Sequence, residues 1–390
     1  RPQRDPRALA AGVAAAVAML ALLLPALALT ALGAALLWPH GDRPTIGAGV
    51  PQDSFRTVTV TEVLTDETDP TRQVRARVDD GDEQWVSVPP EYLTELREGA
   101  RLRVVELPDL PAGVPPYVFV DFERGPPLAV LTALYVVLVV LVARWRGFAS
   151  LLGLGLSLAV IAGFTLPALL LGRPAVGVAL VSASAIMFVV LYLAHGFTLK
   201  TSTALIGTLA GLVATALIAA WASGAAELTG LSGEYGLDLI SYAPQVRLRD
   251  VLLCGMVLAG LGVLNDVTIT QASAVWELRA AAPRTSRREV FASAMRIGRD
   301  HIASTVYTIV FAYLGASLPL VLLVSMSDRS VVGALTSGEL AEEVARTLVG
   351  SIGLVLAIPL TTAVGVLLAG PGAGDTAPAP GPAPGSRTRD

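Results

Sequence analysis

Long apolar stretches separated by short polar segments dominate the pattern of this chain. Eight stretches have the character of transmembrane helices, for which about 20 mainly apolar residues are typical. The pattern therefore predicts a membrane all-α bundle of about eight transmembrane helices. These stretches are residues 8–38, 128–142, 148–171, 175–194, 199–221, 251–276, 302–325 and 348–369.

A different pattern fills residues 41–124, directly after the first apolar stretch. Apolar and polar residues alternate there over five short runs, which is typical of half-buried strands. Asp79-Asp80-Gly81-Asp82 has the composition of a hairpin turn, and a helical turn is expected near Glu91–Arg97. Five short strands predict a small all-β, OB-like domain inserted after the first helix. The runs are residues 55–65, 71–78, 84–88, 101–107 and 117–122.

The composition supports a polytopic membrane protein. Of 390 residues, 53% are hydrophobic and only 15% are charged, whereas soluble domains carry about 25% charged residues. Cys254 is the single cysteine, so no disulfide can form within the chain.

The charges are segregated along the chain. Basic residues flank the first stretch and fill the short loops at 144–146, 200 and 279–299, while the loops at 222–250 and 326–347 are acidic. Because cytoplasmic loops carry the excess of Arg and Lys, this predicts that both termini lie in the cytoplasm. The β-domain and the acidic loops are then expected outside the plasma membrane.

Three further segments complete the predicted organisation. Residues 1–7 form a cytoplasmic N-terminus ahead of an anchor helix at 8–38. A cleaved signal peptide with a site at Ala26-Leu27-Ala28 is the alternative, but its apolar core would be only about 7–15 residues long. Residues 285–299, with Ser286 and Glu289 spaced as a capping box, predict a cytoplasmic amphipathic helix on the membrane surface. The Pro- and Ala-rich residues 370–390 predict a disordered tail.

The sixth apolar stretch contains the most informative polar residues. Leu261–Arg279 begins as an apolar run and then introduces Asn265, Asp266, Thr270 and Gln271. An Asp at the centre of a membrane helix costs about 2.5–3.5 kcal/mol on insertion. We therefore expect Asp266 to face a cavity or a partner rather than lipid.

The seventh stretch supplies candidate partners for Asp266. His301, Thr305 and Thr308 fall on one helical face at spacings of four and seven. A carboxylate, an imidazole and hydroxyl groups are the parts of a proton relay or a cation site, and Asn265 and Thr270 belong to the same set. The alternative is a packing network in which hydroxyl groups donate to Asp266 and His301 lies among the lipid headgroups.

The sequence contains no recognisable enzyme site. No phosphate-binding glycine loop, no spaced metal ligands and no nucleophile with a base are found. We therefore expect no catalytic residues, no cofactor and no metal, although an intramembrane hydrolase without a motif stays open. Residues 42–124 contain 17 acidic residues against 9 arginines, which argues against a nucleic-acid partner.

Two blocks of sequence carry a resemblance to a known family. The segments NDVTITQASAVWELR, from Asn265, and RIGRDHIASTVYTIVFAYLGASLPL, from Arg296, resemble the signature of the YibE/F-like family of bacterial multispanning membrane proteins. The resemblance covers the second to the eighth apolar stretch and implies a multi-pass membrane protein. A weaker similarity links the last three stretches to SecD/SecF-type subunits of proton-driven exporters, which would imply proton coupling.

These observations predict a transporter or export-associated protein, proton-coupled through Asp266. The alternative is a non-transporting scaffold that presents the β-domain to an envelope protein. The bilayer is the expected partner in both cases, and a homo-oligomer is left open.

Overall fold

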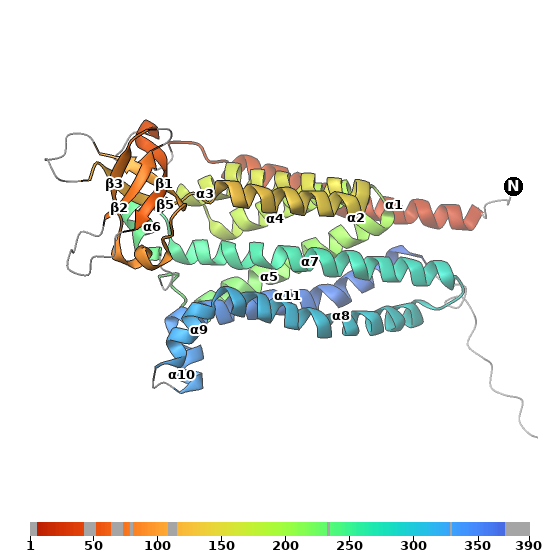
Figure 1. The fold of residues 1–390 in the computed structure, drawn as a ribbon. Coiled ribbons are helices and arrows are strands. Elements are labelled where there is room, and N and C mark those ends of the chain that lie inside the picture. Colours follow the sequence, from red (N-terminus) through yellow and green to blue (C-terminus); the bar gives the residue numbers. More distant parts are fainter. Residues whose placement is uncertain are drawn as a thin grey trace, which may run out of the picture. The chain divides into compact units, whose positions relative to one another are not determined.

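The computed structural model describes residues 6–42, 52–63, 73–78, 81–107, 115–231, 235–327 and 330–370 (Figure 1). The chain forms two compact units. One is Thr45–Val142, which contains the β-domain. The other combines Arg1–Pro44 with Ala143–Asp390 and contains most of the helices.

The β-domain is a closed five-stranded barrel in which the strands follow the order β1-β2-β3-β5-β4. Neighbouring strands are antiparallel, except that β3 and β5 run parallel. Short helices η1 (Gln52–Ser54) and η2 (Pro90–Glu95) precede β1 and β4. The strands are β1 (Phe55–Val63), β2 (Gln73–Val78), β3 (Glu83–Ser87), β4 (Arg101–Glu106) and β5 (Tyr117–Phe122).

The alternating sequence pattern explains the barrel core. In β1, Val58 and Val60 are buried while Thr59 between them is exposed, as expected where successive side chains point to opposite faces. The inward residues of the other strands complete the core, among them Val74, Val86, Leu102 and Val104. The five predicted strands and the helical turn are therefore confirmed. Asp79 and Asp80 of the predicted hairpin turn lie outside the described residues.

The second unit is helical. Its elements and the helix shared with the first unit are α1 (Pro6–Leu37), α2 (Gly125–Val160), the π-helical η3 (Ile161–Thr165), α3 (Leu166–Leu170), α4 (Ala175–His195), α5 (Leu199–Ala225), α6 (Gly236–Tyr242), α7 (Leu248–Ala281), α8 (Arg287–Ala316), α9 (Leu318–Ser325), α10 (Val331–Leu335) and α11 (Gly338–Leu368). Within this unit, α4, α5, α7, α8 and α11 lie side by side (Figure 1).

Six helices in the described part of the chain are long and apolar enough to cross a membrane. The bent pair α8 and α9, which meet at 73°, would make a seventh span. The sequence predicted eight because it divided Gly125–Leu170 into two. This element has 46 residues, about 69 Å of helix, which is more than twice the thickness of a bilayer core of about 30 Å. Its backbone leaves the helical region at Arg144 (φ 55°, ψ −133°). The count of eight stays a prediction.

Small residues hold the centre of the helical unit together. A Cβ atom added to Gly207 of α5 would collide with Thr361 of α11, and one added to Gly353 of α11 would collide with Thr215 of α5. Between these contacts, Gly211 approaches Ala357. The order of the three pairs shows that α5 and α11 are antiparallel, and α7 packs against both helices.

Small residues spaced at multiples of four occur in α2 and η3 (Gly155, Gly163) and in α5 (Gly207, Gly211), and only those in α5 make a close helix contact. Gly207 and Gly211 form the α5–α11 contact, as close helix packing in lipid requires. A Cβ added to Gly155 or Gly163 would meet no described atom within 4 Å. Gly153 instead faces Val190 of α4.

The prediction of a separate amphipathic helix at residues 285–299 is wrong in one respect. Ser286 and Glu289 do form a capping box, but the helix that begins there continues without a break to Ala316 as α8. Its apolar face, including Val290 and Ala294, is buried against residues of α7 and α11 rather than lying free for a membrane surface.

The acidic loop predicted before the last apolar stretch is also different. Glu342 and Glu343 lie in the first turns of α11, which continues through Pro359 to Leu368. Glu342 is buried and accepts a hydrogen bond from the backbone N–H of Gly230 (2.9 Å). The predicted tail lies outside the described residues beyond Gly370.

The charge segregation and the exposed positions generate a topology prediction. In a Cys254→Ala background, single cysteines at the exposed Asp82 and Glu227 should react with a membrane-impermeant maleimide added to intact cells. A cysteine at the exposed Arg288 should react only after the cells are permeabilised. Reaction at Arg288 in intact cells would contradict the predicted orientation.

The barrel should also fold on its own, because its core is complete within residues 52–122. Residues 41–124 expressed alone should give a circular-dichroism spectrum rich in β-structure. Val58→Asp should abolish that spectrum, since it puts an unpaired carboxylate in the core. The neighbouring Thr59→Asp, on the exposed face, serves as the matched control and should leave it intact. Equal tolerance of both substitutions would rule out this core.

Candidate functional site

Helix α7 carries Asp266 far from either end of the helix. It begins at Leu248 and ends at Ala281, so Asp266 lies about 27 Å from its start and about 22 Å from its end. On either side of Asp266, the buried residues Leu264, Val267 and Thr268 face the bundle. Asp266 itself points away from that core, and 68% of its side chain is exposed on the surface of the described unit.

Helix α8 brings His301 to the same depth. It starts at Arg287, so His301 lies about 21 Å along the helix. Because α7 and α8 are joined by the short turn at 282–286, equal distances from that turn place the two residues side by side. The side chain of His301 is 25% exposed.

The two side chains form an ion pair whenever the imidazole is protonated. His301 Nε2 lies 3.6 Å from Asp266 Oδ2, which is within ion-pair range but too long for a hydrogen bond. His301 Nε2 is shielded from solvent and has no hydrogen-bond partner among the described residues. The structure therefore brings together the carboxylate and the imidazole of the candidate relay.

The candidate hydroxyl groups do not reach the carboxylate. Thr270 donates to the backbone carbonyl of Asp266 (2.7 Å), and Thr305 donates to that of His301 (2.8 Å). Thr308 donates to the carbonyl of Ser304 (3.3 Å). Each hydroxyl group therefore donates its one hydrogen bond to a backbone carbonyl of its own helix, as Ser and Thr side chains commonly do.

Asn265 is the remaining member of the predicted set. Its Oδ1 atom is buried and has no hydrogen-bond partner among the described residues. A buried acceptor left unpaired costs about 1–3 kcal/mol. Beside Asp266, this atom is an unused acceptor for a proton donor or a cation.

The sequence pointed to Gln271 as a polar residue of this stretch, but it was not assigned to the candidate site. It is 2% exposed, and its side-chain amide donates to the carbonyl of Ala294 on α8 (2.9 Å) and to the hydroxyl of Thr362 on α11 (2.7 Å). Gly298 of α8 lies against this amide and against Ile358 of α11. We call Gln271, Gly298 and Thr362 the three-helix junction. Its signal in the sequence was an uncharged amide within an apolar span.

The three-helix junction sets the position of α8 on α7. Gln271 is five residues after Asp266, and Gly298 is three residues before His301. The contact at the junction therefore fixes the register in which His301 faces Asp266 one turn away.

The site offers little for a metal ion. No group of three His, Cys, Asp or Glu side chains able to hold one exists within the part of the chain that the structure describes. Asp266 and His301 alone supply two such groups.

The long apolar helices define a multi-pass membrane protein. A comparison with protein-family models matches the YibE/F-like protein family over residues 131–371, which is most of the chain. The chain therefore belongs to the YibE/F-like family, as the sequence blocks around Asn265 and Arg296 indicated. Neither the curated proteins nor the solved structures gave a match. The similarity to SecD/SecF-type subunits stays a prediction.

The three-helix junction generates a stability prediction with a control on the same helix. A Cβ added at Gly298 would lie 2.6 Å from Ile358 Cγ2 and 3.1 Å from Gln271 Oε1, whereas one added at Gly315 meets nothing within 4 Å. Gly298→Ala should therefore lower the unfolding temperature of the detergent-solubilised protein by several degrees. Gly315→Ala should leave it unchanged or raise it slightly, because alanine favours the helix. Equal effects of the two substitutions would argue against the junction.

Proposed function

We propose that this protein is a transporter or export-associated protein of the bacterial plasma membrane, in which Asp266 takes up and releases protons and His301 relays them. One observation carries the proposal. The carboxylate and the imidazole lie 3.6 Å apart, each more than 20 Å from the turn that joins their helices. Ionisable groups inside membrane spans are expensive and usually functional.

The surroundings of the pair suit proton transfer better than a rigid structural contact. Asp266 accepts no side-chain hydrogen bond from Thr270, Thr305 or Thr308, since those hydroxyl groups donate to backbone carbonyls. The exposed carboxylate is therefore free to change partner. Asn265, the residue before Asp266, has a buried Oδ1 without a hydrogen-bond partner among the described residues.

The proposal includes an orientation. Both termini lie in the cytoplasm, and the barrel, which we infer to be OB-like from its five strands and its parallel β3–β5 pair, lies outside. The positive-inside distribution of arginines supports this orientation. The barrel is predominantly acidic, and three of its arginines pair with Glu62, Glu83 and Glu106 at 3.3–3.8 Å. We therefore propose no nucleic-acid partner and no enzymatic role.

A non-transporting scaffold is the second candidate. The observation that favours it is the self-contained core of the barrel, which forms a compact unit of its own. In that function the barrel would contact an envelope protein, and the Asp266–His301 pair would only join α7 to α8.

The test measures the protonation of Asp266 directly. In purified protein reconstituted into phospholipid vesicles, dicyclohexylcarbodiimide, which modifies protonated carboxyl groups in apolar surroundings, should label Asp266 at acidic pH and lose that labelling as the pH rises. His301→Gln should change the pH dependence of this labelling, because it removes the imidazole that lies 3.6 Å from the carboxylate. Peptide mass spectrometry reads the site and its extent.

Two controls complete the test. Asp300→Asn, which removes an exposed carboxylate next to His301, should leave the labelling profile unchanged. In cells lacking the protein, Asp266→Asn should be expressed normally but should not restore the deletion phenotype. Full complementation by Asp266→Asn across the external pH range would contradict the proton relay and favour the scaffold function.

A further inference from the structure

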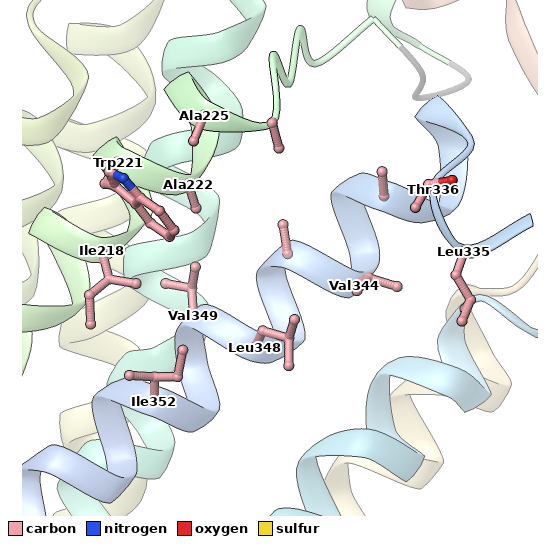
Figure 2. Close-up of a pocket in the computed structure, with 13 residues that line it drawn as sticks. Ile218, Trp221, Ala222, Ala225, Leu335, Thr336, Val344, Leu348, Val349 and Ile352 are labelled. Atoms are coloured by element: carbon pink, nitrogen blue, oxygen red, sulfur yellow. The ribbon is translucent and has the colours of Figure 1, made fainter. Parts of the chain in front are cut away.

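An apolar groove lies between the C-terminal end of α5 and the N-terminal half of α11. It has a volume of about 540 Å³, and Leu335 at the end of α10 and the following Thr336 also line it. Figure 2 shows Ile218, Trp221 and Ala222 of α5 along one wall and Leu348 and Ile352 of α11 along the other. We call it the α5–α11 groove.

Small side chains make the groove hollow. Ala222, Ala225 and Ala226 line it from α5, and Ala341 and Ala345 line it from α11. Further along the same two helices, Gly211 and Gly353 bring the backbones into close contact. The helices therefore diverge from a tight contact towards an open end, and alanines leave the space between them unfilled.

The groove has the depth of one leaflet. On α11 its lining extends from Ala341 to Ile352, which is about 17 Å of helix. Half of a bilayer core is about 15 Å. Both walls belong to helices that are long and apolar enough to span the membrane. Trp221, which is 72% exposed, lies one turn from the end of α5, where aromatic residues mark the membrane interface.

The apolar side chains that line the groove favour a hydrocarbon ligand. Among the described lining residues, Thr336 supplies the one hydroxyl group. Apolar cavities of this kind exclude water, and the volume lies within the about 300–1,000 Å³ of small-molecule sites. The open side shows apolar side chains, including Leu348 (55% exposed) and Ile352 (43% exposed). In a bilayer, those side chains face acyl chains.

We propose that the α5–α11 groove is a binding site for one acyl chain of a membrane phospholipid, which enters sideways from a single leaflet. The site uses neither Asp266 nor His301, so it stands independently of the proton relay. It gives the protein a ligand class, a long-chain amphiphile, that nothing in the polar part of the bundle indicates.

The test is photocrosslinking in a defined bilayer. Full-length protein is reconstituted into vesicles of phosphatidylethanolamine and phosphatidylglycerol containing a small, increasing fraction of phosphatidylglycerol with a diazirine in its palmitoyl chain. After irradiation, adducts should concentrate on peptides containing Trp221–Ala226 and Ala341–Ile352 and should saturate as the probe fraction rises. Proportional labelling of every exposed helix would mean annular lipid only and would overturn the proposal.

Variants that fill the groove sharpen the test. Ala222→Phe and Ala345→Phe should each reduce the adducts on these peptides several-fold. Ala312→Phe adds the same bulk at an exposed alanine of α8 that lines neither this groove nor the smaller cavity beside it, and it should leave the adducts unchanged. Leu348→Asn, which makes the exposed wall polar without filling it, should also reduce them, so the result does not depend on one bulky substitution.

Two further outcomes decide against the proposal. Adducts that persist undiminished in both Ala222→Phe and Ala345→Phe would show that the acyl chain does not lie in the groove. Absence of adducts from these two peptides while other exposed helices are labelled would show that no lipid chain reaches this face, as expected if a second copy of the protein covers it. Loss of carbodiimide labelling at Asp266 has no bearing on either outcome, so failure of the relay and failure of the lipid site are distinguishable.

Discussion

The close contact between α5 and α11 is the interaction on which the rest of the helical unit depends. Lipid supplies no hydrophobic force between helices, so they are held by van der Waals packing and by hydrogen bonds. Gly207 against Thr361 and Gly353 against Thr215 allow the two backbones to meet without a gap. α7 then closes the third side, where the hydroxyl groups of Thr208 and Thr268 share a buried hydrogen bond of 2.6 Å.

The Asp266–His301 pair is a consequence of that packing. α8 contacts the core through the three-helix junction, and the absence of a side chain at Gly298 lets α8 approach Gln271 closely. His301 is one turn further along the same helix. The distance between the imidazole and the carboxylate is therefore set by packing between uncharged groups. The two helices are held together by those groups rather than by the Asp266–His301 pair.

Much of the fold could be predicted because its signals are local. Alternation over β1 to β5 needs only neighbouring residues, and Tyr117–Phe122 was predicted to the residue. The pairing of His301 with Asp266 followed from helix periodicity and a short connection. The continuity of α8 could not be predicted, because an apolar face at Val290 and Ala294 has the same period whether membrane or another helix covers it.

Two parts of the site were beyond the reach of sequence patterns. Thr270 and Thr305 have a choice between a distant carboxylate and a carbonyl one turn back on their own helix, and only the packed structure shows that the nearer acceptor is used. The role of Gln271 depends on Thr362, 91 residues away. Spacing along one helix carries no information about such a contact.

Pro359 interrupts the backbone hydrogen bonding of α11. Proline has no N–H, so the carbonyl of Val355 lacks its helical hydrogen bond and the helix can bend there with one fewer bond to break. Beyond the proline, Thr362 is clamped by Gln271. Before it, between Leu340 and Ile352, the helix has a cavity on either side. α11 therefore has one fewer backbone hydrogen bond between two anchored points, the Glu342–Gly230 hydrogen bond before the proline and the Thr362–Gln271 hydrogen bond beyond it.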